Sequence, residues 1–248
     1  MGTADPPTYD VAAADHGHVR LLTLNRPGKL NAFTPEGYRA LRARLEECAV
    51  DAGVSVCVLT GAGRAFSSGV DLSVMGRPDG STELGAEFDP LLERLATFPK
   101  PLVAAVNGVA VGFGATLLLH CDIVVVDEAA EVRMPFVRLG TCAEAASSWL
   151  LPQRVGMQQA SWMVLSGTGL DARAAVANGF ALAVAPAGAV VRAALERAQA
   201  MAEHPVAALV ANKRLLREGW AEAIDAVWAR EKEAMKSVAA ELGPIGWA

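Results

Sequence analysis

The sequence predicts an α/β fold with a helical C-terminal region. Short runs of β-branched and apolar residues alternate with amphipathic helical segments along most of the chain, which is typical of strands joined by helices. The 248 residues are 52% hydrophobic and 20% charged. The chain can therefore bury a large core, and it does not have the composition of a disordered protein.

The N-terminal part is expected to hold two strands and one helix. Residues 1–17 are rich in Ala, Pro and Asp and are predicted to be loosely held. Strands are predicted at residues 19–24 and 54–60. Between them, Thr34 is a candidate N-cap with Pro35 at the first helical position. The helix that follows has an apolar face made of Tyr38, Leu41, Leu45 and Cys48.

The middle of the chain repeats this alternation. Residues 76–81 form a turn-rich stretch that predicts a mobile loop. Strands are predicted at residues 102–106 and 123–126, separated by a glycine-rich turn and a short buried helix at 115–119. An amphipathic helix before the first of these strands carries Leu84, Phe88, Leu91, Leu92 and Leu95.

The remainder of the chain is predicted to be mainly helical. Asp171 is a candidate N-cap and Gly179 a candidate helix stop, followed by a short apolar strand at residues 181–184. Two long amphipathic helices are expected at about residues 188–203 and 219–240.

Charge and cysteine content exclude several functions. Twenty-two Lys and Arg stand against 27 Asp and Glu, a formal net charge of −5, and no basic run is present. Nucleic-acid binding is therefore not expected. The four cysteines include no CxxC pair and the four histidines are not spaced as ligands, which predicts reduced thiols, no metal site and a cytoplasmic protein. No secretory signal is expected.

One segment raises the question of a membrane span. Residues 101–121 carry no charged side chain and are long enough to cross a bilayer. Gly108 and Gly112 even have the GxxxG spacing of paired membrane helices. A strand bounded by Pro101, a glycine-rich turn and a short core helix fit the composition better, so no membrane partner is expected.

Motifs for nucleotide binding and serine hydrolysis are incomplete. The turn at residues 61–63 has Phe66 where a dinucleotide fingerprint needs a small residue, and no GxxxxGK[ST] loop occurs. Residues 65–69 lack the first glycine of the GxSxG elbow. His120 lies in an apolar run and is expected to be a core histidine, so a Ser–His hydrolase is not favoured.

Two glycine-rich turns can be interpreted together. Gly69 and the turn at residues 112–114 each follow a predicted strand, and glycine lets a ligand approach the backbone closely. A peptide N–H from each turn can form an oxyanion hole for a carbonyl whose charge grows in the transition state. The alternative is that the glycines only permit tight turns or close helix packing.

Four segments support a family resemblance. They are residues 24–32 (LNRPGKLNA), 58–72 (VLTGAGRAFSSGVDL), 100–108 (KPLVAAVNG) and 121–123 (CDI). In this order and spacing they resemble the crotonase (enoyl-CoA hydratase/isomerase) superfamily over residues 19–185.

The resemblance implies a crotonase (ClpP-like) spiral of ββα repeats, with C-terminal helices that assemble homotrimers or dimers of trimers. We expect the spiral core in residues 1–185 and the helical region in residues 186–248, as parts of one functional unit. The resemblance also implies an acyl-CoA thioester substrate, with CoA as part of that substrate and no separate cofactor.

The resemblance assigns site residues as well. The two oxyanion-hole N–H groups map onto Ser68 and Phe113. Backbone around Lys29, Leu30 and Ala32 is expected to meet the adenine end of CoA. The remaining substrate contacts are expected from Ser67, Gly69, Asp71, Leu72, Gly112 and Phe136.

The acid–base residues distinguish the members of the superfamily. Hydratases use two glutamates, at positions that hold Thr116 and Phe136 here, so ordinary hydratase activity is not expected. The run around Glu144 is similar to the peroxisomal-type Δ3,Δ2-enoyl-CoA isomerases, in which this Glu is the catalytic base. The resemblance therefore implies an isomerase of fatty acid metabolism that moves the double bond of 3-enoyl-CoA to trans-2-enoyl-CoA. An apolar surround such as Phe136 and Trp149 is expected to raise the pKa of Glu144.

The sequence leaves open other roles for Glu144 and other functions for the protein. Residues 141–144 also fit a capping box, with Thr141 as N-cap and Glu144 at the third helical position. The subgroup's Pro and Gly around the Glu are Ala143 and Ala145 here. Another reaction on acyl-CoA, hydration or thioester hydrolysis, and a non-catalytic CoA-binding subunit are the competing functions.

Candidate contacts of the CoA phosphates are equally open. Arg26, Lys29 and Arg64 are cations within or beside the matching segments, and each is otherwise an ordinary surface charge.

Overall fold

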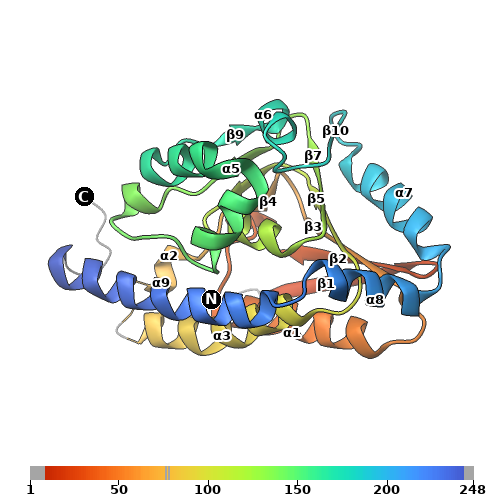
Figure 1. Ribbon diagram of the computed structural model, residues 1–248, viewed down its shortest axis with the longest axis horizontal. Helices are drawn as coiled ribbons and strands as arrows, with labels where there is room; N and C mark the ends of the chain where they lie inside the picture. The colour runs from red at the N-terminus through yellow and green to blue at the C-terminus, as the bar shows by residue number, and fades with distance from the viewer. Residues whose placement is uncertain (1–8, 76, 78, 243–248) are drawn as a thin grey trace, which may run out of the picture.

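A computed structural model of the chain describes residues 9–75, 77 and 79–242 (Figure 1). In these residues the backbone forms two β-sheets surrounded by helices. The mixed α/β architecture expected from the sequence is confirmed.

The larger sheet has the strand order β1-β2-β3-β5-β7-β10 and is parallel except for the β1–β2 pair. The central strands are almost entirely buried, as expected for parallel strands with helices on both faces. The six strands are β1 (Asp10–His16), β2 (Val19–Asn25), β3 (Val56–Gly61), β5 (Leu102–Val106), β7 (Ile123–Asp127) and β10 (Ala183–Ala185).

The smaller sheet contains the second strand of each ββα repeat. Its order is β4-β6-β8-β9, with β9 antiparallel to β8. The pairs β3–β4, β5–β6 and β7–β8 each give their first strand to the larger sheet and their second to the smaller one. A helical segment follows each pair, which is the ββα repeat that the resemblance implied. The strands are β4 (Ala65–Ser67), β6 (Val109–Val111), β8 (Glu131–Arg133) and β9 (Leu170–Asp171).

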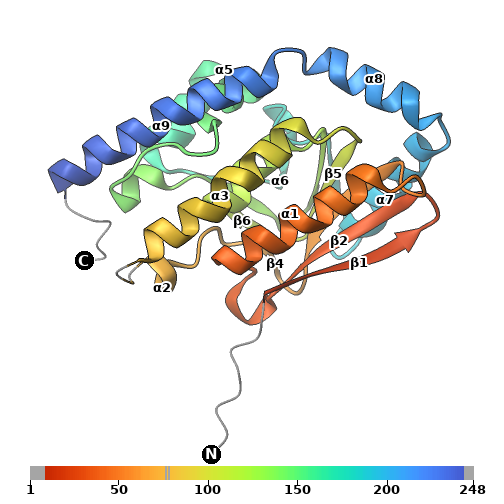
Figure 2. The ribbon, with the colours of Figure 1, turned by 90° about the horizontal axis from the view of Figure 1, so that it is seen from below.

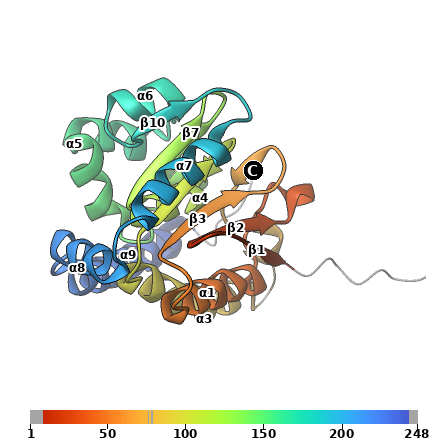
Figure 3. The same ribbon diagram turned by 90° about the vertical axis from the view of Figure 1, so that its right-hand side faces the viewer.

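Alternating side chains divide the core between the two faces of the larger sheet. On one face Val58, Val103 and Val125 pack against α7 (Val190–Ala202). The other face carries Leu22, Leu59 and Ala104 and packs in the main core with α1 (Pro35–Val50) and α3 (Gly80–Thr97) (Figure 3).

The remaining helical segments connect these layers or cover their ends. They are the 3-10 helices η1 (Pro27–Lys29), η2 (Leu117–His120) and η3 (Phe136–Leu139), and α2 (Leu72–Met75), α4 (Phe113–Thr116), α5 (Ser147–Ser166), α6 (Ala172–Ala177), α8 (Val206–Leu216) and α9 (Trp220–Leu242). α5 is kinked at Gly156, whose φ of 76° is not helical.

The C-terminal helix α9 lies along α3 (Figure 2). The Trp228 ring packs 5.1 Å from Phe88, and its indole Nε1 donates a hydrogen bond to Asp89 at 2.8 Å. Lys232 also forms an ion pair with Asp89. These contacts place the last helix over the pocket described below.

The expectation of a loosely held start is wrong for residues 10–16. They form the edge strand β1, paired with β2 from Asp10–Asn25 to His16–Val19. Only Val11 of this strand is buried. Pairing with β2 supplies the order that the Ala- and Asp-rich sequence did not suggest, because edge-strand pairing is set by the partner and not by local propensity.

Capping residues follow the sequence-based predictions. Thr34 accepts a hydrogen bond from the Gly37 amide at the start of α1, and Asp171 accepts one from Ala174 at the start of α6. Residues 101–121 form β5, β6, α4 and η2 in place of one long helix. No helix in the described part of the chain is long and apolar enough to cross a membrane.

Several elements were not predicted, among them the strands β4, β6, β8 and β9 and the helix α8. The four strands have only two or three residues each, whereas α8 has 11 residues. In the predicted loop 76–81, Gly76 and Pro78 lie outside the described residues, and Gly80 and Ser81 begin α3.

Candidate active site

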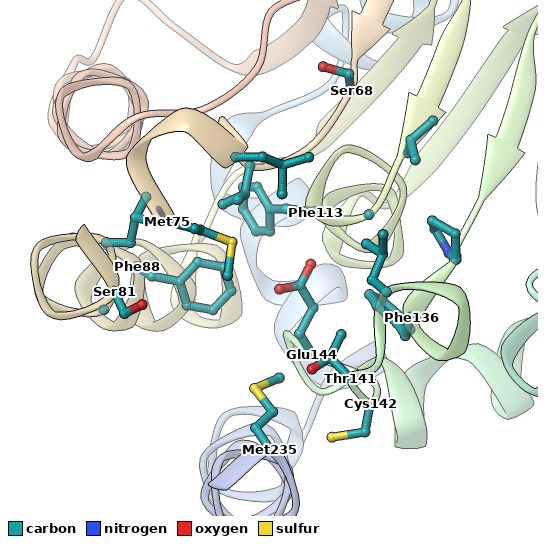
Figure 4. Close-up of a pocket in the computed structure, with 18 of the residues that line it drawn as sticks. Ser68, Met75, Ser81, Phe88, Phe113, Phe136, Thr141, Cys142, Glu144 and Met235 are labelled. Carbon is teal, nitrogen blue, oxygen red and sulfur yellow. The ribbon is translucent and has the colours of Figure 1, made fainter. Parts of the chain in front are cut away.

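A largely apolar cavity of about 320 Å³ lies between α1, α3, η3 and α9 (Figure 4). Its walls bring together segments that are far apart in the sequence. The lining residues are Tyr38, Ser68, Val70, Leu72, Met75, Ser81, Leu84, Gly85, Phe88, Val111, Gly112, Phe113, Pro135, Phe136, Leu139, Thr141, Cys142, Glu144, Trp228 and Met235. Glu144 is the one Asp or Glu among these described lining residues.

The Glu144 carboxylate points into this cavity toward Phe113 (Figure 4). Its backbone carbonyl accepts a hydrogen bond from Ser147 at 2.9 Å, but the carboxylate has no hydrogen-bond partner in the described part of the chain. Burial raises the pKa of Glu144 to about 7, and the nearby charge of Glu231 adds to the rise. A carboxylate with this pKa can accept a proton near neutral pH.

The capping-box alternative for Glu144 is wrong. The helix after this segment begins at Ser147, and Ala146 occupies the N-cap position. Thr141 donates its amide to Phe136 within a non-helical loop. Glu144 therefore precedes the helix and is not tied to its first-turn amides, which leaves the carboxylate free for the cavity.

Phe136 lines the cavity beside Glu144, as expected. Trp149 does not belong to the lining; its ring packs against Trp220 at a centroid distance of 5.7 Å. The two positions that hold glutamate in hydratases, Thr116 and Phe136, are both buried.

The turn before α4 provides one amide donor. Gly112 has φ 54° and ψ −123°, a conformation that favours glycine, and it starts α4 with Phe113 as the first helical residue. The first amide of a helix has no acceptor within the helix. The N–H of Phe113 is therefore available at the cavity wall, as predicted.

The second predicted donor is corrected by the structure. The Ser68 amide donates to the Leu30 carbonyl at 2.9 Å, so it cannot also serve an oxyanion. The amide of Val70, two residues later, has no acceptor in the described residues and also lies on the cavity wall. A Cβ built on the intervening Gly69 would lie 3.3 Å from the Phe113 nitrogen, so the two turns touch here.

Val70 is the functional candidate that the sequence-based assignment missed. The glycine at position 69 was the available signal, because its φ of 88° turns the chain and presents the next amide. Gly69 itself does not line the cavity.

Other predicted contact residues stabilise the loops behind the cavity. Ser67 is buried, donates to the Asn31 carbonyl at 2.9 Å and accepts from the Gly69 amide. Asp71 forms an ion pair with Arg26 at 2.7 Å. Leu72 and Gly112 line the cavity, whereas Lys29, Leu30 and Ala32 lie outside it.

The Arg26–Asp71 ion pair distinguishes Arg26 from the other two candidate contacts of the CoA phosphates, Lys29 and Arg64. Arg26 is held by Asp71 and by the Ala32 carbonyl, which makes it part of the scaffold. Burial opposes ionisation of Asp71, but hydrogen bonds from Ser73 and Arg26 hold its pKa below the ordinary value. Lys29 and Arg64 are exposed and stay candidates. No cluster of three or more His, Cys, Asp or Glu suited to a metal ion occurs in the described residues.

The chain is similar to a family of known proteins. The family model for enoyl-CoA hydratase/isomerase matches residues 15–243. The chain is 40% identical over 222 residues to a 2,3-dehydroadipyl-CoA hydratase of Escherichia coli strain K12, covering 90% of this chain and 87% of that protein. It is 35% identical over 222 residues to enoyl-CoA delta isomerase 2 of Rattus norvegicus, covering 88% of this chain and 56% of the rat protein.

A solved structure shows the same similarity in three dimensions. The enoyl-CoA hydratase/isomerase of Pseudoalteromonas atlantica T6c superposes with a TM-score of 0.86 at 34% identity. The match covers 93% of this chain and 92% of that one.

Proposed function

Because the chain belongs to the enoyl-CoA hydratase/isomerase family, we propose that it is an enoyl-CoA isomerase that converts 3-enoyl-CoA into trans-2-enoyl-CoA with Glu144 as its single base. The supporting observation is that Glu144 is the one carboxylate in the described lining of an otherwise apolar cavity, with a pKa raised to about 7. Both positions that hold glutamates in hydratases have side chains without a carboxylate, Thr116 and Phe136.

The cavity offers a group for each step of the proposed isomerisation. The protons at C2 of a 3-enoyl thioester are acidic, because the resulting dienolate spreads its charge onto the thioester oxygen. Amides of Val70 and Phe113 donate to that oxygen, and losing one such donor typically costs about 2.7–4 kcal/mol. Glu144 removes the C2 proton and returns it at C4, so the carboxylate ends the cycle in its starting form.

The cavity also suggests the kind of acyl chain. Met75, Phe88 and Met235 lie along its walls (Figure 4). Leu84 also lines the cavity, and no Lys, Arg or His occurs in the described lining. A carboxylate at the far end of an acyl chain would lose its hydration without gaining a cation. We therefore expect an uncharged, apolar acyl chain, unlike the dicarboxylic substrate named for the Escherichia coli relative.

Turnover of a medium-chain trans-3-enoyl-CoA tests the proposal. We expect the wild type to form the conjugated 2-enoyl product and Glu144→Gln to lose at least about 100-fold in kcat, with acyl-CoA affinity retained. Glu203→Gln, an exposed site at the end of α7, is the matched control and should keep wild-type activity.

Other outcomes identify the competing functions. Hydration of a trans-2-enoyl-CoA without turnover of the 3-enoyl isomer would contradict the proposal in favour of a hydratase, the activity in the names of several relatives. Release of free CoA thiol indicates thioester hydrolysis, and affinity without turnover in either form indicates a CoA-binding subunit. Equal activity of the wild type and Glu144→Gln excludes Glu144 as the base.

We also propose a cytoplasmic homotrimer. All four cysteines are free thiols, and apolar side chains on α5 remain exposed on the single chain.

A further inference from the structure

Glu231 of α9 is a buried carboxylate whose only cationic influence in the described residues is the charge of the neighbouring Arg230. It is only 5% exposed, and no Lys or Arg forms an ion pair with it in the described part of the chain. Its two oxygens accept hydrogen bonds from two backbone amides, Oε2 from Ala146 at 2.7 Å and Oε1 from Ser148 at 2.9 Å. These contacts join segments 83–85 residues apart.

The two amides lie at the start of α5, directly after Glu144. Ala146 is the N-cap residue of this helix and makes no side-chain cap of its own. Helix N-terminal amides need acceptors, and a negative charge there is favoured by the helix dipole. Glu231 thus supplies from a distant helix the cap that the local sequence lacks.

The backbone between Glu144 and α5 needs this support. Ala145 has φ 55° and Ala146 has φ 58°, both in the left-handed region that is unfavourable for residues with a Cβ. Such conformations persist only where surrounding contacts hold them. Glu231 holds this segment through the Ala146 amide, and the buried ring of His120 holds it through the Ala145 carbonyl at 3.0 Å from Nε2.

We propose that Glu231 is a positioning residue that fixes the Ala145–Ala146 turn and thereby directs the Glu144 carboxylate into the cavity. This inference rests on the proposed function of Glu144 as the base. Glu231 does not line the cavity, so its own carboxylate does not meet the substrate. Each of its two oxygens accepts one amide hydrogen bond, which fixes the carboxylate at the start of α5.

Glu231 also acts on Glu144 through its charge. The groups that face Glu144 are Tyr38 from α1, Cys142 from its own loop and Glu231 from α9. Of these, Glu231 is the one that raises the pKa of Glu144 by its charge, in addition to burial. Burial raises the pKa of Glu231 as well, while the hydrogen bonds from Ser148 and Ala146 and the charge of Arg230 oppose that rise.

Replacement by Glu231→Gln tests both effects. A carboxamide offers one acceptor oxygen and turns its NH2 group toward the other amide, so one of the two hydrogen bonds is lost. We expect kcat to fall about 10–100-fold because the base is misaligned, with little change in KM. We also expect the midpoint of the kcat–pH profile to move to lower pH, because a neighbouring negative charge has been removed. Glu233→Gln on the exposed side of the same helix is the matched control and should change neither quantity.

A direct titration makes the result independent of turnover. The ¹³C-carboxyl NMR signal of Glu144, assigned by its absence in Glu144→Gln, should titrate near pH 7 in the wild type and at least about 0.5 pH units lower in Glu231→Gln. If the wild type does not turn over 3-enoyl-CoA but this shift is seen, the proposed function fails while the coupling of Glu231 to Glu144 stands.

Two results would overturn the inference. One is a folded Glu231→Gln protein with unchanged kcat and unchanged Glu144 titration. The other is a loss of activity with an unmoved Glu144 titration, which would make Glu231 only a structural cap. Should Glu231→Gln fail to fold, Glu231→Asp keeps the charge but shortens the reach. It should lower kcat while leaving the Glu144 midpoint near pH 7, and an unaffected kcat would contradict the positioning role.

Discussion

The carboxylate of Glu144 lies among apolar side chains, and this placement raises its pKa from 4.5 to about 7. The same burial that makes the carboxylate a useful base also makes its ionised form unfavourable in the folded protein. Activity and stability should therefore respond to pH in opposite directions through this one residue.

The sign of the stability effect follows from the two pKa values. Between pH 4.5 and 7 the folded state holds a proton on Glu144 that the unfolded chain releases, so the free energy of unfolding falls as the pH rises. Above pH 7 the free energy of unfolding has fallen by the full amount. Because the side chain is partly exposed to the cavity, this amount is about 1–3 kcal/mol.

The Gln side chain of Glu144→Gln does not ionise, so this variant should not lose stability as the pH rises. Its advantage in stability over the wild type should grow between pH 5 and pH 8, as measured by urea unfolding at each pH. The kcat of the wild type should rise over the same range as the base ionises. Parallel stability curves for the two proteins would show that Glu144 has an ordinary pKa.

At the scale of elements, two turns meet at the proposed oxyanion site. The turn at Gly69 follows β4 and the turn at Gly112 follows β6, and β4 and β6 are paired neighbours in the smaller sheet. Their pairing brings the Val70 and Phe113 amides to one wall of the cavity.

Gly69→Ala should disturb this arrangement. The new Cβ would lie 2.6 Å from the Val111 carbonyl oxygen, and the φ of 88° is unfavourable for alanine. We expect kcat to fall at least about 10-fold, because a misplaced donor loses much of its stabilisation of the oxyanion. Gly28→Ala is the control, since nothing lies within 4 Å of its added Cβ. Wild-type kcat in Gly69→Ala would argue against a donor at this turn.

At the scale of the whole molecule, the last helix completes the site. α9 contributes Trp228 and Met235 to the cavity, and its Glu231 accepts a hydrogen bond from the turn that follows Glu144. The second half of α5, in contrast, leaves Met157, Trp162 and Leu165 between 59% and 73% exposed. Exposed apolar side chains gathered on one element are typical of an association surface.

Assembly can be measured directly. A homotrimer should have three times the 25.8 kDa mass of one chain in sedimentation equilibrium. Trp162→Glu should shift the protein toward the monomer, because a charge cannot be buried there without a partner. Glu203→Gln, directly after α7, should leave the mass unchanged, and a monomeric wild type would refute the trimer.

The sequence by itself determined the elements with strong local signals. The valine-rich strands β3, β5 and β7, the caps at Thr34 and Asp171, and the long helix α9 lie where hydrophobic periodicity and capping chemistry predict them. Short strands of two or three residues and the edge strand β1 carry too little periodicity, and their pairing depends on partners distant in the chain.

Tertiary structure alone decided where the candidate site residues lie and which of their groups are free. The family resemblance singled out Glu144 and Phe113, but it could not show that Glu144 lies outside the helix cap, nor that the Val70 amide is free while the Ser68 amide is not. Those distinctions depend on which backbone groups already have partners, and the Leu30 carbonyl and the Glu231 carboxylate are such partners. Both come from segments that only folding brings beside the site, so no local pattern in the sequence could show them.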